Sequence, residues 1–295
     1  MELIYGDAIK VVWQGNAILG EGAIWDDRSD TLYWVDIKGK ILHAYTPSNN
    51  CNKSIYFPIE ICAVAPRAKG GLVAVTRNGF AHIDLENSVL LPIFDPEAHL
   101  NENRFNDGNV DTSGNFVAGT MHDLEKEKTG RVYCLDRNGV VTQLFGDYVI
   151  CNGPAFSPDG RTLYFSNSKE REILAFPYNP DLRIVGAPKL FAKIGQTEGY
   201  PDGLTVDAEG CVWCARWDGA GISQYSPEGK ILKFIKMPVP RVTRCAFGGP
   251  SYEKLYVTSA SFGLSNSQLK KFPLSGSLFE INSEVRGMPQ KHFLG

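Results

Sequence analysis

The chain has 295 residues, of which 43% are hydrophobic and 11% aromatic, so it can bury a sizeable core. Its formal net charge is −3, and without a polybasic stripe it is not expected to bind nucleic acid or an anionic membrane. No apolar run approaches the roughly 20 residues of a transmembrane helix, and the N-terminal MELIYGDAIK lacks the basic and apolar regions of a secretory signal. We therefore expect a soluble, cytoplasmic protein, and we expect it to be a monomer.

The first predicted element is the stretch from Ala8 to Ala17, which has no pairing partner beside it in the sequence. Six versions of one unit follow, and each reads as a strand, a turn, a second strand, a turn and a third strand. The units span residues 22–47, 64–86, 110–139, 155–180, 204–230 and 246–281. Their second strands recur near residues 33, 73, 116, 163, 212 and 255, a spacing of roughly 40 to 50 residues that is typical of β-propellers.

This repeat predicts an all-β, six-bladed β-propeller that forms a single domain over residues 1–295. We expect the stretch from Ala8 to Ala17 to be the outer strand of the last blade, where it closes the ring and removes an exposed edge. Residues 182–200 and 264–274 are expected to elaborate a blade rather than to link domains.

The seven cysteines are an odd number and are scattered through the predicted strands, unlike the dense framework of a small secreted domain. Cys211 and Cys214 form a CxxC sequence, but residues three apart along a strand point to opposite faces, and no second pair completes a zinc site. We expect seven ordinary buried thiols, with Cys151 of interest because it adjoins Asn152.

Glu21, Asn152 and Asp202 occupy the same phase of three units. Each lies about ten to twelve residues before an apolar pair in a second strand, and Asn106 has the same position in a fourth unit. Because the innermost strand of each blade lines the channel of a propeller, these side chains are predicted to converge at the channel mouth. Such groups at a narrow axis are costly to bury unless they are paired or bind a metal; the alternative is that each caps a turn. In the remaining two units the matching phase carries Ala63 and Arg244.

Several short motifs extend this pattern. They are Leu19-Gly20-Glu21-Gly22 with Trp25, Arg104-Phe105-Asn106-Asp107-Gly108, Gly119-Thr120-Met121, Asn152-Gly153-Pro154 with Ser157-Pro158-Asp159-Gly160, Pro201-Asp202-Gly203 and Phe247-Gly248-Gly249. In these motifs, and in their order, the chain resembles the SMP-30/gluconolactonase/regucalcin-like family of six-bladed propellers over nearly its whole length. The segments Gly119–Asp123 and Gly263-Leu264-Ser265 look most like the bacterial aldonolactonases that act on pentonolactones and hexonolactones.

The resemblance implies one divalent metal cation held by Glu21, Asn152 and Asp202. Carboxylate and amide oxygens suit calcium, magnesium or manganese, and zinc or ferrous iron are tolerated by the same ligands. The sequence does not choose among these metals.

The resemblance also implies that Arg104 and Asn106 contact the hydroxyl groups or the lactone of a sugar. Regucalcin-type members place consecutive acidic residues after the Gly-Thr-Met motif, whereas this chain has His122-Asp123-Leu124-Glu125. We expect Asp123 to take the substrate-contact role, with His122 beside it as the other candidate.

The function implied by the resemblance is metal-dependent hydrolysis of a pentono- or hexono-1,4/1,5-lactone to its aldonic acid. The metal acts as the Lewis acid on the lactone carbonyl, and Asp202 is the expected general base. A G-x-S-x-G sequence is absent, which disfavours a covalent serine mechanism. The alternatives are a calcium-binding, regucalcin-like regulatory or scaffold propeller without turnover, and a related hydrolase of phosphotriesters or larger lactones.

Overall fold

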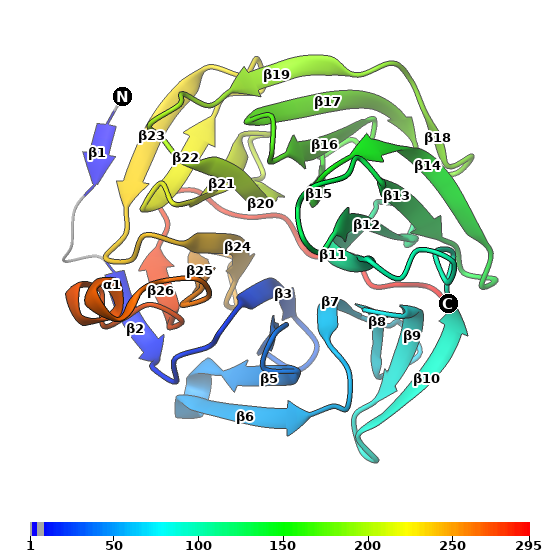
Figure 1. The fold of residues 1–295 in the computed structure, drawn as a ribbon, viewed down its shortest axis with the longest axis horizontal. Coiled ribbons are helices and arrows are strands. Elements are labelled where there is room, and N and C mark those ends of the chain that lie inside the picture. The colour runs from blue at the N-terminus through cyan, green and yellow to red at the C-terminus, as the bar shows by residue number, and fades with distance from the viewer. Residues whose placement is uncertain (1, 5–8) are drawn as a thin grey trace.

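The computed structural model of the chain describes residues 2–4 and 9–295. Six sheets, antiparallel apart from one added strand, are arranged around one axis as the blades of a β-propeller (Figure 1), as the repeat predicts. The second strand of each blade contains the residue predicted for it. These strands are β4 (Thr31–Asp36), β8 (Leu72–Thr76), β12 (Phe116–His122), β16 (Thr162–Asn167), β21 (Val212–Trp217) and β25 (Lys254–Ser259).

The first three blades each contain four strands in sequence order. Blade 1 consists of β3 (Gly20–Asp26), β4, β5 (Ile41–Thr46) and β6 (Cys51–Tyr56), and a short 3-10 helix (Pro47–Asn49) precedes its last strand. Blade 2 consists of β7 (Ile61–Pro66), β8, β9 (Gly79–Asp84) and β10 (Val89–Phe94). Blade 3 consists of β11 (Asn103–Val110), β12, β13 (Gly130–Leu135) and β14 (Val141–Tyr148).

The other three blades carry additions to the repeat. Blade 4 consists of β15 (Cys151–Phe156), β16 and β17 (Glu172–Asn179), to which β18 (Ile184–Val185) and β19 (Lys189–Lys193) both pair. Blade 5 consists of β20 (Tyr200–Val206), β21, β22 (Gly221–Tyr225) and β23 (Ile231–Lys236), and β1 (Glu2–Ile4) pairs parallel to β23. Blade 6 consists of β24 (Val242–Gly248), β25, β26 (Leu278–Asn282) and β2 (Ile9–Trp13).

The N-terminal strand closes the last blade, as predicted, because β2 pairs antiparallel with β26. The strand is shorter than the predicted stretch: it ends at Trp13, and Ala8 lies outside the described residues. Residues 182–200 and 264–274 elaborate blades 4 and 6 as expected, the second of them through helix α1 (Asn266–Lys271). Neither described helix is long and apolar enough to cross a bilayer.

Burial falls from the axis to the rim of the propeller. Every residue of the inner strands β3, β7 and β11 is buried, whereas the outer strands β6 and β10 have no buried residue. The inner strands are covered on both faces because each blade packs between two others, which explains why they lack a polar face. Six of the seven cysteines are free and buried, as predicted, whereas Cys51 is free but partly exposed.

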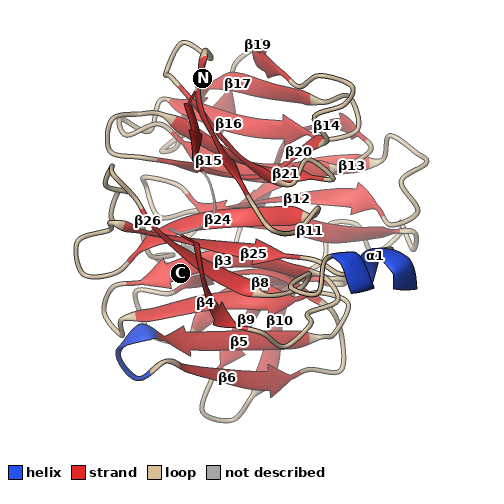
Figure 2. Ribbon diagram, turned by 90° about the vertical axis from the view of Figure 1, so that its left-hand side faces the viewer, coloured by secondary structure: helices blue, strands red, loops and turns tan. Residues whose placement is uncertain are grey.

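A C-terminal segment that the repeat does not predict crosses the face of the disc opposite helix α1. After β26 the chain passes behind the inner strands, drawn in pale red in Figure 1, and Figure 2 shows the C-terminus and α1 on opposite sides. Besides its bonds to blade 6, such as Gly287 N to Tyr252 O, its backbone bonds to three further blades: Arg286 O accepts from Ala208 N, Pro66 O from Phe293 N, and Gly114 O from Leu294 N. The segment therefore ties blades 2, 3 and 5 together.

Candidate metal centre and active site

Each innermost strand has a break in its pairing register at the same level of the channel. In blade 1 the inner strand advances three residues, from Glu21 to Ile24, while its partner advances two, from Val35 to Tyr33. Such a β-bulge re-aims the side chains beside it and often lies next to a functional site. The corresponding shifts in the other blades lie at Ile61/Ala63, Phe105/Gly108, Asn152/Ala155, Pro201/Leu204 and Val242/Arg244.

The bulges explain two glycines of the sequence motifs. Gly22 and Gly153, which follow Glu21 and Asn152, have φ values of +60° and +51°, a region that side-chain-bearing residues rarely adopt. A Cβ on Gly153 would also lie 2.6 Å from the backbone nitrogen of Leu204 in the next blade. Glycine is therefore required for the backbone that presents Asn152.

One cavity of about 270 Å³ brings together five of the six predicted site residues. The predicted residues in its lining are Glu21, Arg104, Asn106, Asn152 and Asp202, and the other polar lining residues are Glu125, Ser168, Lys169 and Asp218. All five predicted residues are buried, between 4% and 7% exposed. They reach one cavity from blades 1, 3, 4 and 5, as the shared repeat phase predicts.

A chain of hydrogen bonds fixes the amide side chains of this cavity. Arg104 Nη1 donates to Asn106 Oδ1 at 2.9 Å, and Asn106 Nδ2 donates to Asn152 Oδ1 at 2.7 Å. Asn152 Nδ2 donates in turn to Ser168 Oγ at 3.1 Å, which donates to Pro201 O at 2.7 Å. Because each amide nitrogen is committed to donate, the Asn152 oxygen is oriented toward Asn106 and the cavity rather than toward Ser168.

Two carboxylates are buried together in the same cavity. The pKa of Glu21 is raised to about 8, mainly by burial and secondly by the charge of Asp107. The pKa of Asp202 is raised well above its usual value, mainly by burial and secondly by the charges of Glu21 and Asp107. The ionised forms are therefore costly in the absence of a cation.

This donor set fits a hard divalent cation. Glu21 and Asp202 supply carboxylate oxygens, and Asn152 supplies an amide oxygen held in place by its neighbours. Oxygen ligands of this kind suit calcium, magnesium or manganese, and a cation between the two carboxylates would offset the cost of burying both charges.

Asp123 is not part of the cavity lining and instead holds Arg104. Its Oδ1 accepts from Arg104 Nε at 2.7 Å and from Lys38 Nζ at 3.1 Å, and Arg77 contacts its Oδ2. Partial burial acts to raise the pKa of Asp123, but the charge of Arg104 and the hydrogen bonds from Arg77 and Lys38 outweigh it and hold the pKa well below its usual range. His122, the other candidate, is buried outside the lining, and its Nδ1 accepts from Leu124 N at 3.2 Å.

Sequence reasoning did not identify the apolar side of the cavity. Trp217 and Tyr200 face each other across β20 and β21, and Phe262 precedes helix α1. Arg241 lies over the Trp217 ring, 4.6 Å from its centroid. The sequence could have identified Tyr200, because it adjoins the Pro201-Asp202-Gly203 motif, but Trp217 and Phe262 have no motif beside them. The apolar lining residues are Leu19, Met121, Ile150, Tyr200, Pro201, Trp217 and Phe262.

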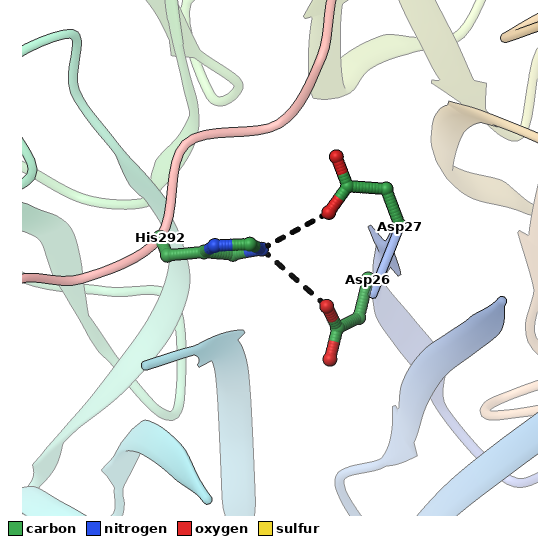
Figure 3. A group of neighbouring side chains, drawn as sticks. All are labelled: Asp26, Asp27 and His292. Carbon is green, nitrogen blue, oxygen red and sulfur yellow. Dashed lines mark ion pairs between the residues drawn. The ribbon is translucent and has the colours of Figure 1, made fainter. Parts of the chain in front are cut away.

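A second group of potential ligand atoms lies at the opposite end of β3. Figure 3 shows His292, from the C-terminal segment, pointing at Asp26 and Asp27. His292 Nε2 lies 3.4 Å from an oxygen of each carboxylate, but Asp26 already pairs with Arg28 at 3.1 Å and Asp27 accepts from Tyr252. The existing partners account for both carboxylates, so this group does not require a metal.

Comparisons with known proteins agree with this architecture. The family description SMP-30/Gluconolactonase/LRE-like region matches residues 19–261. The chain is 33% identical to regucalcin of Xenopus laevis over 94% of this chain and 95% of the relative. It is 31% identical to 6-deoxy-6-sulfogluconolactonase of Pseudomonas putida, over 98% of this chain and 99% of the relative. The crystal structure of a calcium-binding protein, regucalcin, from Agrobacterium tumefaciens is similar with a TM-score of 0.95 at 29% identity, covering 99% of each chain. The chain therefore belongs to the SMP-30/gluconolactonase family of six-bladed propellers.

Proposed function

We propose that the protein is a divalent-cation-dependent hydrolase that opens a sugar lactone to its aldonic acid. The observation that carries the proposal is the pairing of two buried carboxylates and an oriented amide oxygen with a guanidinium in one cavity of about 270 Å³. That volume suits a small hydroxylated substrate rather than a macromolecule. The name of the Pseudomonas putida relative, 6-deoxy-6-sulfogluconolactonase, supports a lactone as the substrate class.

Glu21, Asn152 and Asp202 would hold the cation. The chemistry that a bound divalent cation supplies is polarisation of the lactone carbonyl and a lowered pKa for the attacking water. Asp202 is the proton acceptor in this proposal, because a carboxylate at the cation in the cavity can take the proton of the attacking water.

The reaction then balances with no covalent enzyme intermediate. Asp202 takes a proton from water as the water oxygen bonds to the carbonyl carbon. The bond between that carbon and the ring oxygen breaks, and the ring oxygen receives the proton from Asp202. The product is the open hydroxy acid, which ionises at neutral pH.

Arg104 and Asn106 are assigned to substrate binding. Arg104 donates from Nε to Asp123 and from Nη1 to Asn106, so its guanidinium is fixed at the cavity wall. A fixed guanidinium can donate to the carbonyl or hydroxyl oxygens of the lactone and stabilise negative charge that develops there. Asp123 thus acts through Arg104 in this proposal, rather than by contacting the sugar as the sequence led us to expect.

The test is proton release from a panel of pentono- and hexonolactones, measured with metal-loaded protein and with exhaustively chelated protein. We expect turnover of at least one lactone that chelator abolishes and added cation restores. Turnover that survives chelation would remove the cation from the mechanism.

A second candidate is a calcium-binding regulatory propeller without turnover, and the names of the Xenopus and Agrobacterium relatives favour it. It shares the cation site but predicts stoichiometric calcium binding with no hydrolysis of any lactone in the panel. The two candidates therefore differ in the same experiment.

A further inference from the structure

An ion pair crosses the channel next to the candidate metal centre. Asp107 belongs to blade 3 and Arg244 to blade 6, which lie on opposite sides of the ring, and Arg244 Nη1 contacts Asp107 Oδ1. The two residues are only 1% and 3% exposed. A buried pair of this kind is costly to desolvate and rarely improves stability over apolar side chains of similar size, so its presence at the axis calls for another explanation.

The pair contacts the backbone beside two of the proposed ligands. Asp107 Oδ2 accepts from Gly153 N at 2.9 Å, next to Asn152. The stem of Arg244 packs on Gly203, next to Asp202, so closely that a Cβ on Gly203 would lie 2.7 Å from Arg244 Cγ. Neither Asp107 nor Arg244 lines the cavity that holds the ligand side chains. The pair is therefore adjacent to the centre without contacting a bound molecule.

The charges of the pair act on the proposed ligands in opposite directions. Asp107 adds a negative charge beside Asn152 through its contact with Gly153, and Arg244 adds a positive charge in the same buried region, with its stem on Gly203 beside Asp202. The two cationic side chains that line the cavity, Arg104 and Lys169, are each paired with a carboxylate, Asp123 and Glu125 respectively. Because charges interact strongly where water is excluded, the affinity of the centre for a cation depends on how Asp107 and Arg244 balance each other.

We propose that Asp107 and Arg244 form a charge-compensating pair that sets the cation affinity of the centre, Asp107 strengthening and Arg244 weakening the binding of a divalent cation. The proposal rests on the metal centre assigned above, but not on its catalytic activity. It makes both residues positioning residues, since each acts on the cation through space and through the ligand backbone.

The test is the Ca²⁺ affinity of the intact protein, measured by calorimetry at one pH. Asp107→Asn keeps the shape of the side chain but leaves Arg244 uncompensated, and we expect the Kd to rise by at least about tenfold, the change that 1.4 kcal/mol produces. Arg244→Met removes the opposing charge, and we expect the Kd to fall by a similar factor. In the double variant the Kd should return to within about threefold of wild type.

A purely structural role of the pair predicts a different pattern, in which both single variants bind Ca²⁺ more weakly and the double variant is no better than either. That result would overturn the proposal. Arg244→Met could fail to fold because Asp107 is left buried and unpaired. In that case the comparison of Asp107→Asn with the double variant still shows whether Arg244 weakens Ca²⁺ binding, since removing Arg244 from the Asp107→Asn protein should lower the Kd. Arg244→Lys, which keeps the charge, should bind Ca²⁺ like wild type.

Failure of the metal centre itself is distinguishable. Wild-type protein that binds none of Ca²⁺, Mn²⁺ and Mg²⁺ would contradict the proposed function, whereas wild-type binding without opposite signs in the two single variants would contradict this inference alone.

Discussion

Asn106 donates from Nδ2 to Oδ1 of Asn152 at 2.7 Å, across the boundary between blades 3 and 4. The same nitrogen also donates to Cys151 O at 3.1 Å. A residue proposed to bind substrate therefore also orients a residue proposed to bind the cation. This bond predicts that the two functions are coupled at Asn106 and separable at Arg104.

For Asn106→Ala we expect weaker cation binding together with weaker catalysis. Loss of a hydrogen bond that orients a ligand typically lowers metal affinity by about 10- to 100-fold, so the Kd for Ca²⁺ should rise within that range and kcat/KM should fall with it. Calorimetry and lactone hydrolysis at saturating cation measure the two effects. The matched control is Asn138→Ala in an exposed turn, and unchanged Ca²⁺ affinity in Asn106→Ala would mean that Asn152 is held by other contacts.

For Arg104→Ala we expect full cation occupancy with kcat/KM lowered by about two to three orders of magnitude, as for the loss of a charged contact near a developing oxyanion. Cation binding survives because the Asn106 nitrogen remains held by Cys151 O, and Asp123 keeps Lys38 and Arg77. Elemental analysis and lactone kinetics separate the two outcomes. Arg137→Ala at an exposed position serves as the control. Wild-type kcat/KM in Arg104→Ala would exclude Arg104 from substrate binding.

The glycine after Asn152 offers a test of the bulge. Gly153→Ala combines an unfavourable positive φ of +51° with a Cβ placed 2.6 Å from Leu204 N. Gly139→Ala is the matched control, because its φ is +82° but nothing lies within 4 Å of the added Cβ. We expect the control to lower the free energy of unfolding by about 1 kcal/mol and Gly153→Ala to lower it by about 3 kcal/mol or more. Equal losses in urea unfolding would show that the bulge tolerates a side chain.

The fold could be predicted from the sequence because each blade repeats the same order of strands, so a polar residue at one phase of several units marks the same level of the channel. Glu21, Asn152 and Asp202 were found in this way. The partners of Asp123 were not, because Lys38 and Arg77 lie in loops of other blades, where no periodicity constrains the side chain. Arg244 was placed near the channel mouth from its phase, but its pairing with Asp107 depends on two blades that face each other across the ring.

The raised pKa of Glu21 predicts how stability depends on pH in the cation-free protein. Its pKa in the folded state is about 8, against a usual value of 4.5, chiefly because of burial. Between these values the folded state retains a proton that the unfolded state releases, so the free energy of unfolding should fall as pH rises. A cation displaces that proton, so the apparent Ca²⁺ affinity should rise over the same interval and level off above pH 8 or so.

Thermal unfolding from pH 5 to pH 9, with chelator and with saturating Ca²⁺, measures both trends. Glu21→Gln is the control, because it removes the titrating group. If the chelated wild-type protein and chelated Glu21→Gln show the same dependence of Tm on pH, Glu21 does not carry a raised pKa.

The most direct test of the proposed mechanism is the rate of lactone hydrolysis by Asp202→Asn that has been shown to be loaded with cation. The amide oxygen of asparagine can remain a ligand, but asparagine cannot accept the proton of the attacking water. With an aldonolactone that the wild-type protein hydrolyses, we predict a fall in kcat of at least about 100-fold, in the range attributed to general-base catalysis, at unchanged cation occupancy. Hydrolysis near the wild-type rate by cation-loaded Asp202→Asn would contradict the account.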